Sequence, residues 1–346
     1  MQFKTILLFL LGNFCLGILA ADIDPNLIPK DRPLATLGEG AFGKAELTLY
    51  DESQMVVRKE IPNYLTRPVK YKIYNIFNIV EICANYELYA SPFLSSAFGV
   101  YFDSYNGVIE KDTLNFAMEP MLGGTLLHLH HFLQQNPSLL SLDLVKLMLA
   151  RIALGIDDMH KKGWAWLDAS MRNIFIDHQT GYPRLGDFGL ARLLNKAAEQ
   201  KDWDGFADNI AKSLIGLLGD NFKQASKNLS ESLKNKPSIE GVQSALIFQD
   251  FNWQGAKEGN LSMGFIPKDS AAYLKMVYGG NNDVIGRISR GEKALDASSM
   301  GGFVMGQTLL EEINKTLPRG AKKIKNAGDF CRIMLKEDIF PVTYPY

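Results

Sequence analysis

Two polar motifs, close together in the middle of the chain, restrict what it can fold into more than any other feature. The first runs from Asp168 to Asn173 as Asp-Ala-Ser-Met-Arg-Asn and continues into an apolar segment, Ile174–Ile176. The second, Gly-Asp-Phe-Gly, places Asp187 14 residues after Asn173. An Asp and an Asn five positions apart can share one loop, with the carboxylate facing a substrate hydroxyl and the amide oxygen facing a metal. The carboxylate of Asp187 is a suitable oxygen ligand for Mg²⁺.

A glycine-rich motif, Gly-x-Gly-x-x-Gly, lies near the start of the chain at Gly38, Gly40 and Gly43. Glycines allow a backbone to approach phosphate groups closely, although a plain glycine-rich turn has the same composition. A dinucleotide-binding loop would open a helix. Here the alternating residues 44–50 predict a strand, and the polar residues 51–54 predict a turn. The order therefore favours a strand–loop–strand lid over phosphates.

A lysine on the next predicted strand suits the same phosphates. Lys59 lies in the β-branched segment Met55–Glu60, and a lysine there can neutralise phosphate charge if an acidic side chain holds it in place. A long amphipathic segment, Tyr74–Tyr89, predicts a helix that carries two candidates for this partner. Glu81 is the first choice and Glu87 the second.

The pattern changes from short strands, between Leu34 and Phe116, to helices after Leu126. Ser141 is placed to cap a helix, and apolar residues then recur at helical spacing: Val145, Leu149, Ile152, Ile156 and Met159. The same spacing returns at Phe206, Ile210, Leu214 and Leu217. Residues 240–305 are rich in Gly, Asn and Ser and predict no clear element.

With these motifs in this order, residues 34–220 resemble a eukaryotic-type protein kinase. The resemblance implies an α+β, bilobal protein-kinase-like fold. A small β-rich N-lobe would span residues 34–118, and a larger helical C-lobe would span 119–346, with residues 240–305 as an atypical region.

The resemblance also implies a role for each motif. Asp168 would be the catalytic base, with Lys59 and Arg172 as further catalytic residues, and Asn173 and Asp187 would hold Mg²⁺. The segment Met118-Glu119-Pro120-Met121 resembles the hinge between the lobes, with Met118 as gatekeeper and the backbone of Glu119 and Met121 bonding adenine. The residues expected to bind ATP are Leu37, Gly38, Gly40, Gly43, Ala45, Val57, Lys59, Glu81, Met118, Glu119 and Met121.

The catalytic loop departs from the family pattern at three positions. Trp166 and Leu167 stand where the family has His-Arg, and Ser170 stands where a lysine follows the catalytic Asp. Arg172 occupies the position of an arginine in tyrosine-kinase loops, so it is a candidate to supply the missing charge at the transferred phosphate.

The segment after Gly189 is short. If Asp208 opens the central helix of the large lobe, only 21 residues separate it from Asp187, and no Ala-Pro-Glu occurs between them. The platform for an extended peptide is therefore expected to be reduced or rebuilt. Residues 190–203 contain no Ser, Thr or Tyr, so activity is expected not to need phosphorylation of this segment.

Three functions fit these motifs. The first is a protein kinase of the secretory route that transfers the γ-phosphoryl group of ATP to a protein hydroxyl, Ser or Thr rather than Tyr. The second is a kinase-like phosphotransferase for a small molecule, which the short segment favours. The third is a nucleotide-binding pseudokinase, which the lost His-Arg favours.

The amino-acid composition limits the kinds of molecule that the protein is expected to bind. The 346 residues include 37 Lys and Arg against 38 Asp and Glu, so the charge is nearly balanced and does not favour nucleic acid. A monomer acting on a protein substrate is expected. Three cysteines are too few for a disulfide scaffold. Cys83 and Cys331 are expected to be buried free thiols, because they fall in different predicted lobes.

The first 21 residues predict a secretory signal peptide. Lys4 precedes an apolar run, Ile6–Ala21, that ends in small residues before Asp22. The run is shorter than the roughly 20 apolar residues of a membrane span, so cleavage is favoured over a signal anchor. A linker over residues 22–33, a secreted or lumenal protein without membrane attachment, and glycosylation at the sequons of Asn228, Asn260 and Asn314 are then expected.

The mature chain should begin at Ala21 or Asp22. N-terminal sequencing of secreted material checks this, and recovery of the uncleaved segment in a membrane pellet would favour the anchor instead.

Overall fold

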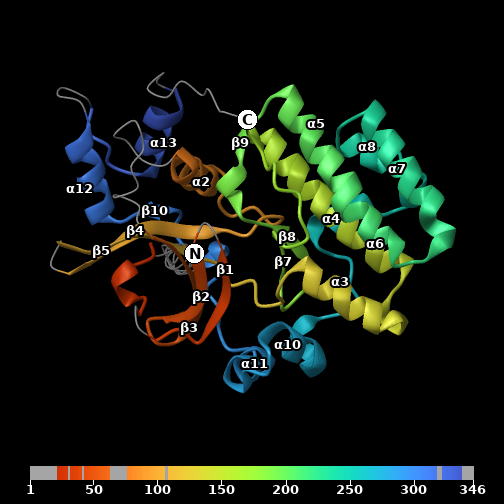
Figure 1. Ribbon diagram of the computed structural model, residues 1–346, viewed down its shortest axis with the longest axis horizontal. Helices are drawn as coiled ribbons and strands as arrows, with labels where there is room; N and C mark the ends of the chain where they lie inside the picture. The colour runs from red at the N-terminus through yellow and green to blue at the C-terminus, as the bar shows by residue number, and fades with distance from the viewer. Residues whose placement is uncertain are drawn as a thin grey trace, which may run out of the picture.

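The structure is a computed structural model that describes residues 22–29, 32–40, 43–62, 76–105, 108–317 and 322–336. The predicted signal peptide, residues 1–21, and two residues of the glycine motif, 41 and 42, lie outside these ranges. A β-rich lobe and a helical lobe lie side by side, so the expected bilobal α+β fold is confirmed (Figure 1). Across the described ranges, no helix is long and apolar enough to cross a membrane.

The strands lie mainly in the first lobe. They are β1 (Ala35–Gly40), β2 (Gly43–Tyr50), β3 (Gln54–Pro62), β4 (Ala97–Tyr105), β5 (Val108–Met118), β6 (Trp164–Ala165), β7 (Ile174–Ile176), β8 (Pro183–Leu185), β9 (Arg192–Leu193) and β10 (Val304–Met305). The α-helices are α2 (Ile76–Glu87), α3 (Leu126–Gln135), α4 (Leu142–Lys161), α5 (Lys196–Gly205), α6 (Lys212–Gly216), α7 (Lys223–Asn235), α8 (Ile239–Gln243), α9 (Trp253–Glu258), α10 (Ala271–Tyr278), α11 (Asn282–Ser289), α12 (Gln307–Thr316) and α13 (Ala327–Lys336).

One six-stranded sheet forms the β-rich lobe, in the order β1-β2-β3-β5-β4-β10. Its first five strands pair antiparallel. The register sets Ala45 opposite Lys59 and Val57 opposite Met118. Because directly opposed residues share a face of a sheet, these four side chains lie on one face.

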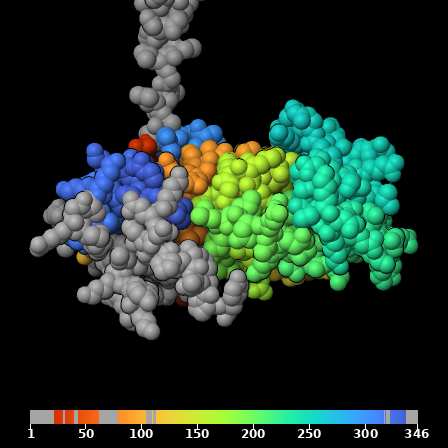
Figure 2. Space-filling model, turned by 90° about the horizontal axis from the view of Figure 1, so that it is seen from above, coloured from red at the N-terminus to blue at the C-terminus, as the bar shows by residue number. Residues whose placement is uncertain are grey.

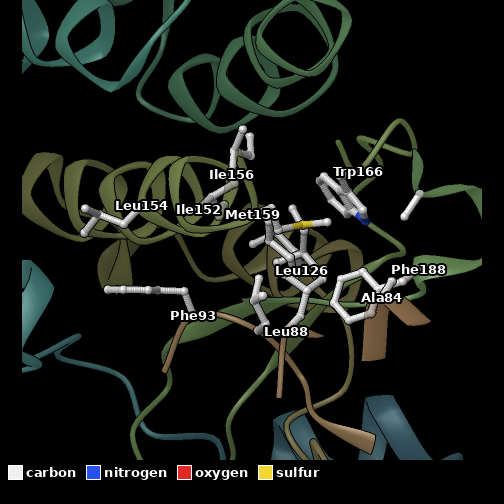
Figure 3. Close-up of a cluster of buried hydrophobic side chains, with 14 of the residues drawn as sticks. Ala84, Leu88, Phe93, Leu126, Ile152, Leu154, Ile156, Met159, Trp166 and Phe188 are labelled. Atoms are coloured by element: carbon white, nitrogen blue, oxygen red, sulfur yellow. The ribbon is translucent and has the colours of Figure 1, made fainter. Parts of the chain in front are cut away.

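Helix α4 is the core of the helical lobe. The Ser141 hydroxyl caps it by accepting the N–H of Leu144 at 3.1 Å, as the sequence predicts. Its apolar residues, among them Ile152, Ile156 and Met159, are buried, and Figure 3 shows them above the strands. The predicted apolar helix after Phe206 also forms, but a π-helical turn, Phe206–Ala211, interrupts it between α5 and α6.

The unassigned region 240–305 contains the short helices α8 to α11. Helix α10 fixes the chain that connects the lobes, because two tyrosine hydroxyls donate to backbone oxygens there. Tyr273 bonds to Gly123 at 2.6 Å and Tyr278 bonds to Leu122 at 2.9 Å. Helix α10 therefore holds the chain segment between the two lobes in place at Leu122 and Gly123.

The C-terminal residues correct the predicted division into lobes. Strand β10 pairs parallel with β4 in the N-lobe sheet, and the N–H of Leu295 bonds to the carbonyl of Met55 at 2.9 Å. Helix α12 lies against β4, and α13 lies beside α2 (Figure 1). In the space-filling view, the blue C-terminal residues lie on the side of the orange N-lobe residues, away from the cyan helices (Figure 2). Residues 293–317 and 322–336 thus belong with the N-lobe, although they follow the helical lobe in sequence.

The prediction of two free thiols was wrong for the same reason. Cys83 of α2 and Cys331 of α13 form a disulfide, with their Cα atoms 5.3 Å apart across 248 residues of sequence. Placing the C-terminus in the large lobe had separated the two cysteines.

Within the predicted linker, residues 22–33, the segment 22–28 packs against the sheet. Ile23 and Ile28 are 4% and 3% exposed, in an apolar cluster with Val56 and Phe98 on the face of the sheet opposite Lys59. The N–H of Asp51 bonds to the carbonyl of Leu27 at 2.9 Å. Apolar contact and this bond together explain why the segment is ordered.

Two of the three sequon asparagines have side chains engaged within the fold. The side-chain oxygen of Asn228 accepts the N–H of Leu246 at 2.8 Å. The amide of Asn314 donates to the carbonyls of Leu310 and Ile324 and accepts the N–H of Ile324, all at 2.8 Å. Glycosylation of Asn314 would have to break these bonds. Asn260 is exposed, and its modification remains a prediction.

Replacing either buried isoleucine should destabilise the protein. Ile23→Ala or Ile28→Ala should lower the free energy of unfolding by about 2–5 kcal/mol, because each leaves a cavity in the core. Leu27→Ala is the matched control: Leu27 is 39% exposed, and its loss should cost less than about 0.5 kcal/mol. Urea unfolding measures all three, and equal losses would contradict this packing.

Candidate active site

A buried lysine links two carboxylates from different parts of the chain. The Nζ of Lys59, on β3, lies 2.5 Å from Oε1 of Glu81 on α2 and 3.1 Å from Oδ1 of Asp187. Lys59 and Glu81 are 15% and 5% exposed, whereas Asp187 is 39% exposed. Burial acts to lower the pKa of Lys59, but the two carboxylates outweigh it and hold the pKa above its ordinary value. Lys59 is therefore a fixed cation next to an accessible carboxylate.

Glu87, the second candidate for the lysine partner, has a different contact. Its Oε2 accepts the indole N–H of Trp164 at 2.8 Å, which ties the end of α2 to β6 of the helical lobe. The side-chain amide of Asn85, one helical turn after Glu81, donates to the carbonyl of Glu81 at 2.8 Å. The helix register thus turns Glu81 toward Lys59.

The loop that carries Asp168 is held by a buried aspartate that the sequence analysis did not identify. Asp202, on α5, accepts the backbone N–H groups of Trp166 at 2.8 Å and Leu167 at 2.6 Å, and it pairs with His160 at 2.9 Å. Leu167 has a positive φ of 64°, an uncommon conformation for leucine that these bonds stabilise.

The position of Asp202 corrects the prediction that Asp208 opens this helix. Helix α5 begins at Lys196, after Asn195 caps it by accepting the N–H of Ala198 at 2.9 Å. Asp208 is exposed within the π-helical turn. No local sequence motif distinguishes Asp202 from Asp208. Only the tertiary contacts show that Asp202 is the one that binds the catalytic loop.

Trp166, which stands where the family has histidine, is bonded to the chain just before Asp187. Its indole N–H donates to the carbonyl of Gly186 at 3.0 Å, directly before Asp187, and its side chain is fully buried. Figure 3 shows Trp166 close to Phe188, with Ala84 and Leu88 of α2 nearby. The missing histidine therefore does not leave the Asp187 segment without support.

Asp168 has a perturbed carboxyl group. Burial raises its pKa, and the carboxylate of Asp187 raises it further, while the Asn173 amide and the Lys201 ammonium act in the opposite direction. The amide of Asn173 donates to the backbone oxygen of Asp168 at 3.3 Å. The loop therefore brings Asp168, Asn173 and Asp187 into one electrostatic site.

The described part of the glycine motif lies on β1 and β2, and β2 pairs with the strand that carries Lys59. Gly43 has a φ of +138°, and a Cβ there would lie 1.9 Å from the carbonyl oxygen of Glu60, so only glycine fits. Gly38 has no neighbour within 4 Å of an added Cβ, which leaves open space beside its backbone. The backbone of Gly40 pairs with Gly43, and Leu37 is 40% exposed on the same strand.

The connection between the lobes begins where β5 ends at Met118. The N–H of Glu119 bonds to the carbonyl of Ser96 at 2.9 Å, and both oxygens of its carboxylate contact Nη1 of Arg184 at 3.1 Å. Burial raises the pKa of Glu119, and Arg184 opposes the shift. Met121 is half-buried in the same connection. The predicted adenine-binding backbone is thus anchored through the Glu119 side chain.

The oxygen atoms present fit one hard cation bound jointly with a nucleotide. Asp187 supplies an accessible carboxylate and Asn173 a partly buried amide, which are ligands that Mg²⁺ accepts. Within the described ranges, no group of three or more His, Cys, Asp or Glu side chains could hold a metal without such help.

The chain segment between Asp187 and α5, where a substrate would bind, is short. Asn195 caps α5 only eight residues after Asp187, and in between β9 pairs with β6. Helix α5 approaches the catalytic loop closely: a Cβ on Gly205 would lie 2.7 Å from that of Ala169. Lys201 lies one helical turn before Gly205 and is exposed, so it is a second cation near Asp168 besides the exposed Arg172.

A family model described as the protein kinase domain matches residues 32–218. The chain belongs to the protein kinase family. The human serine/threonine-protein kinase Nek5 is 29% identical over 167 residues, which cover 48% of this chain and 22% of that protein. Nek8 of Danio rerio is 26% identical over 160 residues, 46% of this chain and 21% of that protein.

A third relative is named as a tyrosine kinase, not as a serine/threonine kinase. The tyrosine-protein kinase JAK1 of Danio rerio is 23% identical over 195 residues, 54% of this chain and 15% of that protein. The chain spans about a fifth of the length of the first two relatives and less of the third. Family membership thus rests on the kinase domain alone.

Removing one acceptor from Asp202 should loosen the catalytic loop. In Asp202→Asn, an N–H of the buried loop loses its charged partner, so the free energy of unfolding should fall by about 1–3 kcal/mol. Asp204→Asn is the control on the same helix, because Asp204 is exposed and its carboxylate accepts a bond from the side-chain amide of Gln200 at 2.9 Å. Its cost should stay below about 0.5 kcal/mol in denaturant unfolding. Equal effects would contradict the anchoring role.

Proposed function

We propose that this kinase-family protein transfers the γ-phosphoryl group of ATP to a hydroxyl of a protein substrate, Ser or Thr rather than Tyr. The observation that carries the proposal is the joint placement of Lys59, Asp168, Asn173 and Asp187, with Lys59 held by Glu81 at 2.5 Å. Phosphoryl transfer depends mostly on positioning and charge, and these groups supply both. The two serine/threonine-kinase relatives support the hydroxyl specificity.

Each group has a role that its surroundings allow. Lys59 would neutralise the α- and β-phosphates, and its raised pKa keeps it charged at every physiological pH. Mg²⁺ bound by Asn173 and Asp187 would neutralise the negative charge of the phosphates. Asp168 would orient the substrate hydroxyl and accept its proton, because it is the remaining carboxylate of the loop.

A second function is favoured by one observation. The seven residues between Asp187 and Asn195 leave little chain to bind an extended peptide, and β9 uses part of it to pair with β6. A compact small-molecule alcohol would not need such a platform. A nucleotide-binding pseudokinase is the third outcome, and the absence of transfer to any acceptor would support it.

We place this activity in the secretory route. The predicted signal peptide and the Cys83–Cys331 disulfide both support that placement, since disulfides persist mainly in oxidising compartments.

Substitution of the phosphate and metal groups should abolish transfer. Lys59→Met and Asp187→Ala should reduce kcat to background with Mg²⁺-ATP, tested on generic protein substrates and small alcohols. Asp168→Asn should lower kcat by about 10²–10⁴-fold and leave nucleotide binding largely intact, because the base acts on the acceptor. Unchanged kcat in Asp168→Asn would contradict the base assignment, and transfer to small alcohols alone would select the second function.

Lys201 should tune the pH dependence of the reaction. Asp168 must be ionised to accept a proton, so activity falls as the pH drops through its raised pKa, and Lys201 opposes that rise. Removing the ammonium in Lys201→Met should therefore move the acidic limb of the kcat profile to higher pH. Lys201→Arg should keep the limb in place, as should Lys212→Met, an exposed lysine on α6. An unmoved limb in Lys201→Met would exclude this influence.

A further inference from the structure

Helix α2 is connected to three different parts of the molecule within seven residues. Glu81 binds Lys59 of the sheet, and Glu87 accepts the indole N–H of Trp164 from the helical lobe. Between them, Cys83 is bonded to Cys331 of α13. The disulfide lies only two residues from the carboxylate that holds the catalytic lysine.

Helix α13 is itself fixed to the sheet, so it can serve as a support for α2. Its residues Phe330 and Cys331 are 0% and 2% exposed. Asn314 of α12 binds both backbone groups of Ile324 just before α13, and α12 packs against β4. Gly328 lies so close to α2 that an added Cβ would be 2.7 Å from the Tyr86 hydroxyl. The contact between the two helices is therefore close-packed.

The segment after Gly189 has no site at which phosphorylation could order it. Residues 190–195 contain no Ser, Thr or Tyr that could be phosphorylated, and Leu167 stands where an arginine would receive such a phosphate. A covalent bond to α2 can supply the missing constraint, because Lys59 of β3 and Glu81 of α2 stay paired only while α2 keeps its position against the sheet.

We propose that the Cys83–Cys331 disulfide and α13 position Glu81 against Lys59, so that phosphoryl transfer depends on the oxidised state of this cysteine pair. The inference rests on the proposed function for its catalytic consequence. Cys83, Cys331 and α13 are positioning elements and touch no reacting group.

The switch between the two states is a two-electron reduction. A dithiol reductant breaks the S–S bond, each cysteine sulfur gains one electron and one proton, and the reductant becomes a cyclic disulfide. Both cysteines are almost fully buried, at 0% and 2% exposure, so a reductant reaches them only when the α2–α13 contact opens. The variant Cys331→Ala removes the bond without requiring that access.

Hydrogen–deuterium exchange of the full mature chain tests the positioning directly, without any activity. In Cys331→Ala, backbone amides of α2 should exchange at least about tenfold faster than in the oxidised protein, because local opening becomes easier. Amides of β2 and β3 should change much less. Unchanged exchange in α2 would overturn the proposal, whether or not the protein transfers phosphate.

A double-mutant cycle tests the catalytic consequence. Loss of the disulfide, by Cys331→Ala or by dithiothreitol, should lower kcat by about five- to tenfold in an otherwise unchanged chain. In Glu81→Gln the same loss should change kcat by less than about twofold, because the positioned group is already impaired. An equal loss in both backgrounds would mean that the disulfide acts only on stability, and this would overturn the proposal.

Two controls separate the possible failures. Ile23→Ala destabilises the opposite face of the sheet and should leave kcat and its response to dithiothreitol unchanged. Cys83→Ala combined with Cys331→Ala should be insensitive to dithiothreitol, which assigns the response to this bond. If the oxidised protein transfers no phosphate while α2 still responds in hydrogen exchange, the proposed function fails and the positioning stands.

Discussion

The ion pair between Lys59 and Glu81 is the interaction on which the rest of the site depends. Two opposite charges buried together are tolerable only when each satisfies the other, because either one alone would incur a desolvation penalty of several kcal/mol. The sheet fixes the lysine, but the glutamate depends on where α2 lies. The surroundings of α2 therefore decide whether the site exists: Trp164 from the helical lobe, Phe188 near Asp187, and α13.

The catalytic loop shows how lost family residues are compensated by neighbours. Trp166 reaches the backbone before Asp187 with its indole N–H, so the chain there keeps a side-chain donor. Asp202 accepts two backbone N–H groups of the loop, and α5 begins early enough that its last turn, at Gly205, lies beside Ala169. Shortening the segment after Gly189 and bringing Lys201 near Asp168 are thus two results of the same early helix.

The sequence predicted what local patterns encode. The glycine motif, Lys59, Glu81 and the Asp168–Asn173 loop occur at the spacing that a kinase domain requires, and the structure pairs Lys59 with Glu81 and with Asp187. The disulfide could not be predicted, because its cysteines are 248 residues apart and the strand that returns the chain to the sheet, Val304–Met305, is only two residues long. Asp202 was missed because only tertiary contacts distinguish it from Asp208.

The parallel pairing of β10 with β4 has a consequence for synthesis of the chain. The first five strands of the N-lobe sheet leave the ribosome about 180 residues before the strand that covers the edge of β4, and the helical lobe is made in between. Until then the β4 edge lies unpaired, and such an edge invites pairing with other chains. The helical lobe can form early, whereas the N-lobe, which begins the chain, is completed last. During synthesis, this topology therefore leaves the edge of β4 exposed to pairing with other chains.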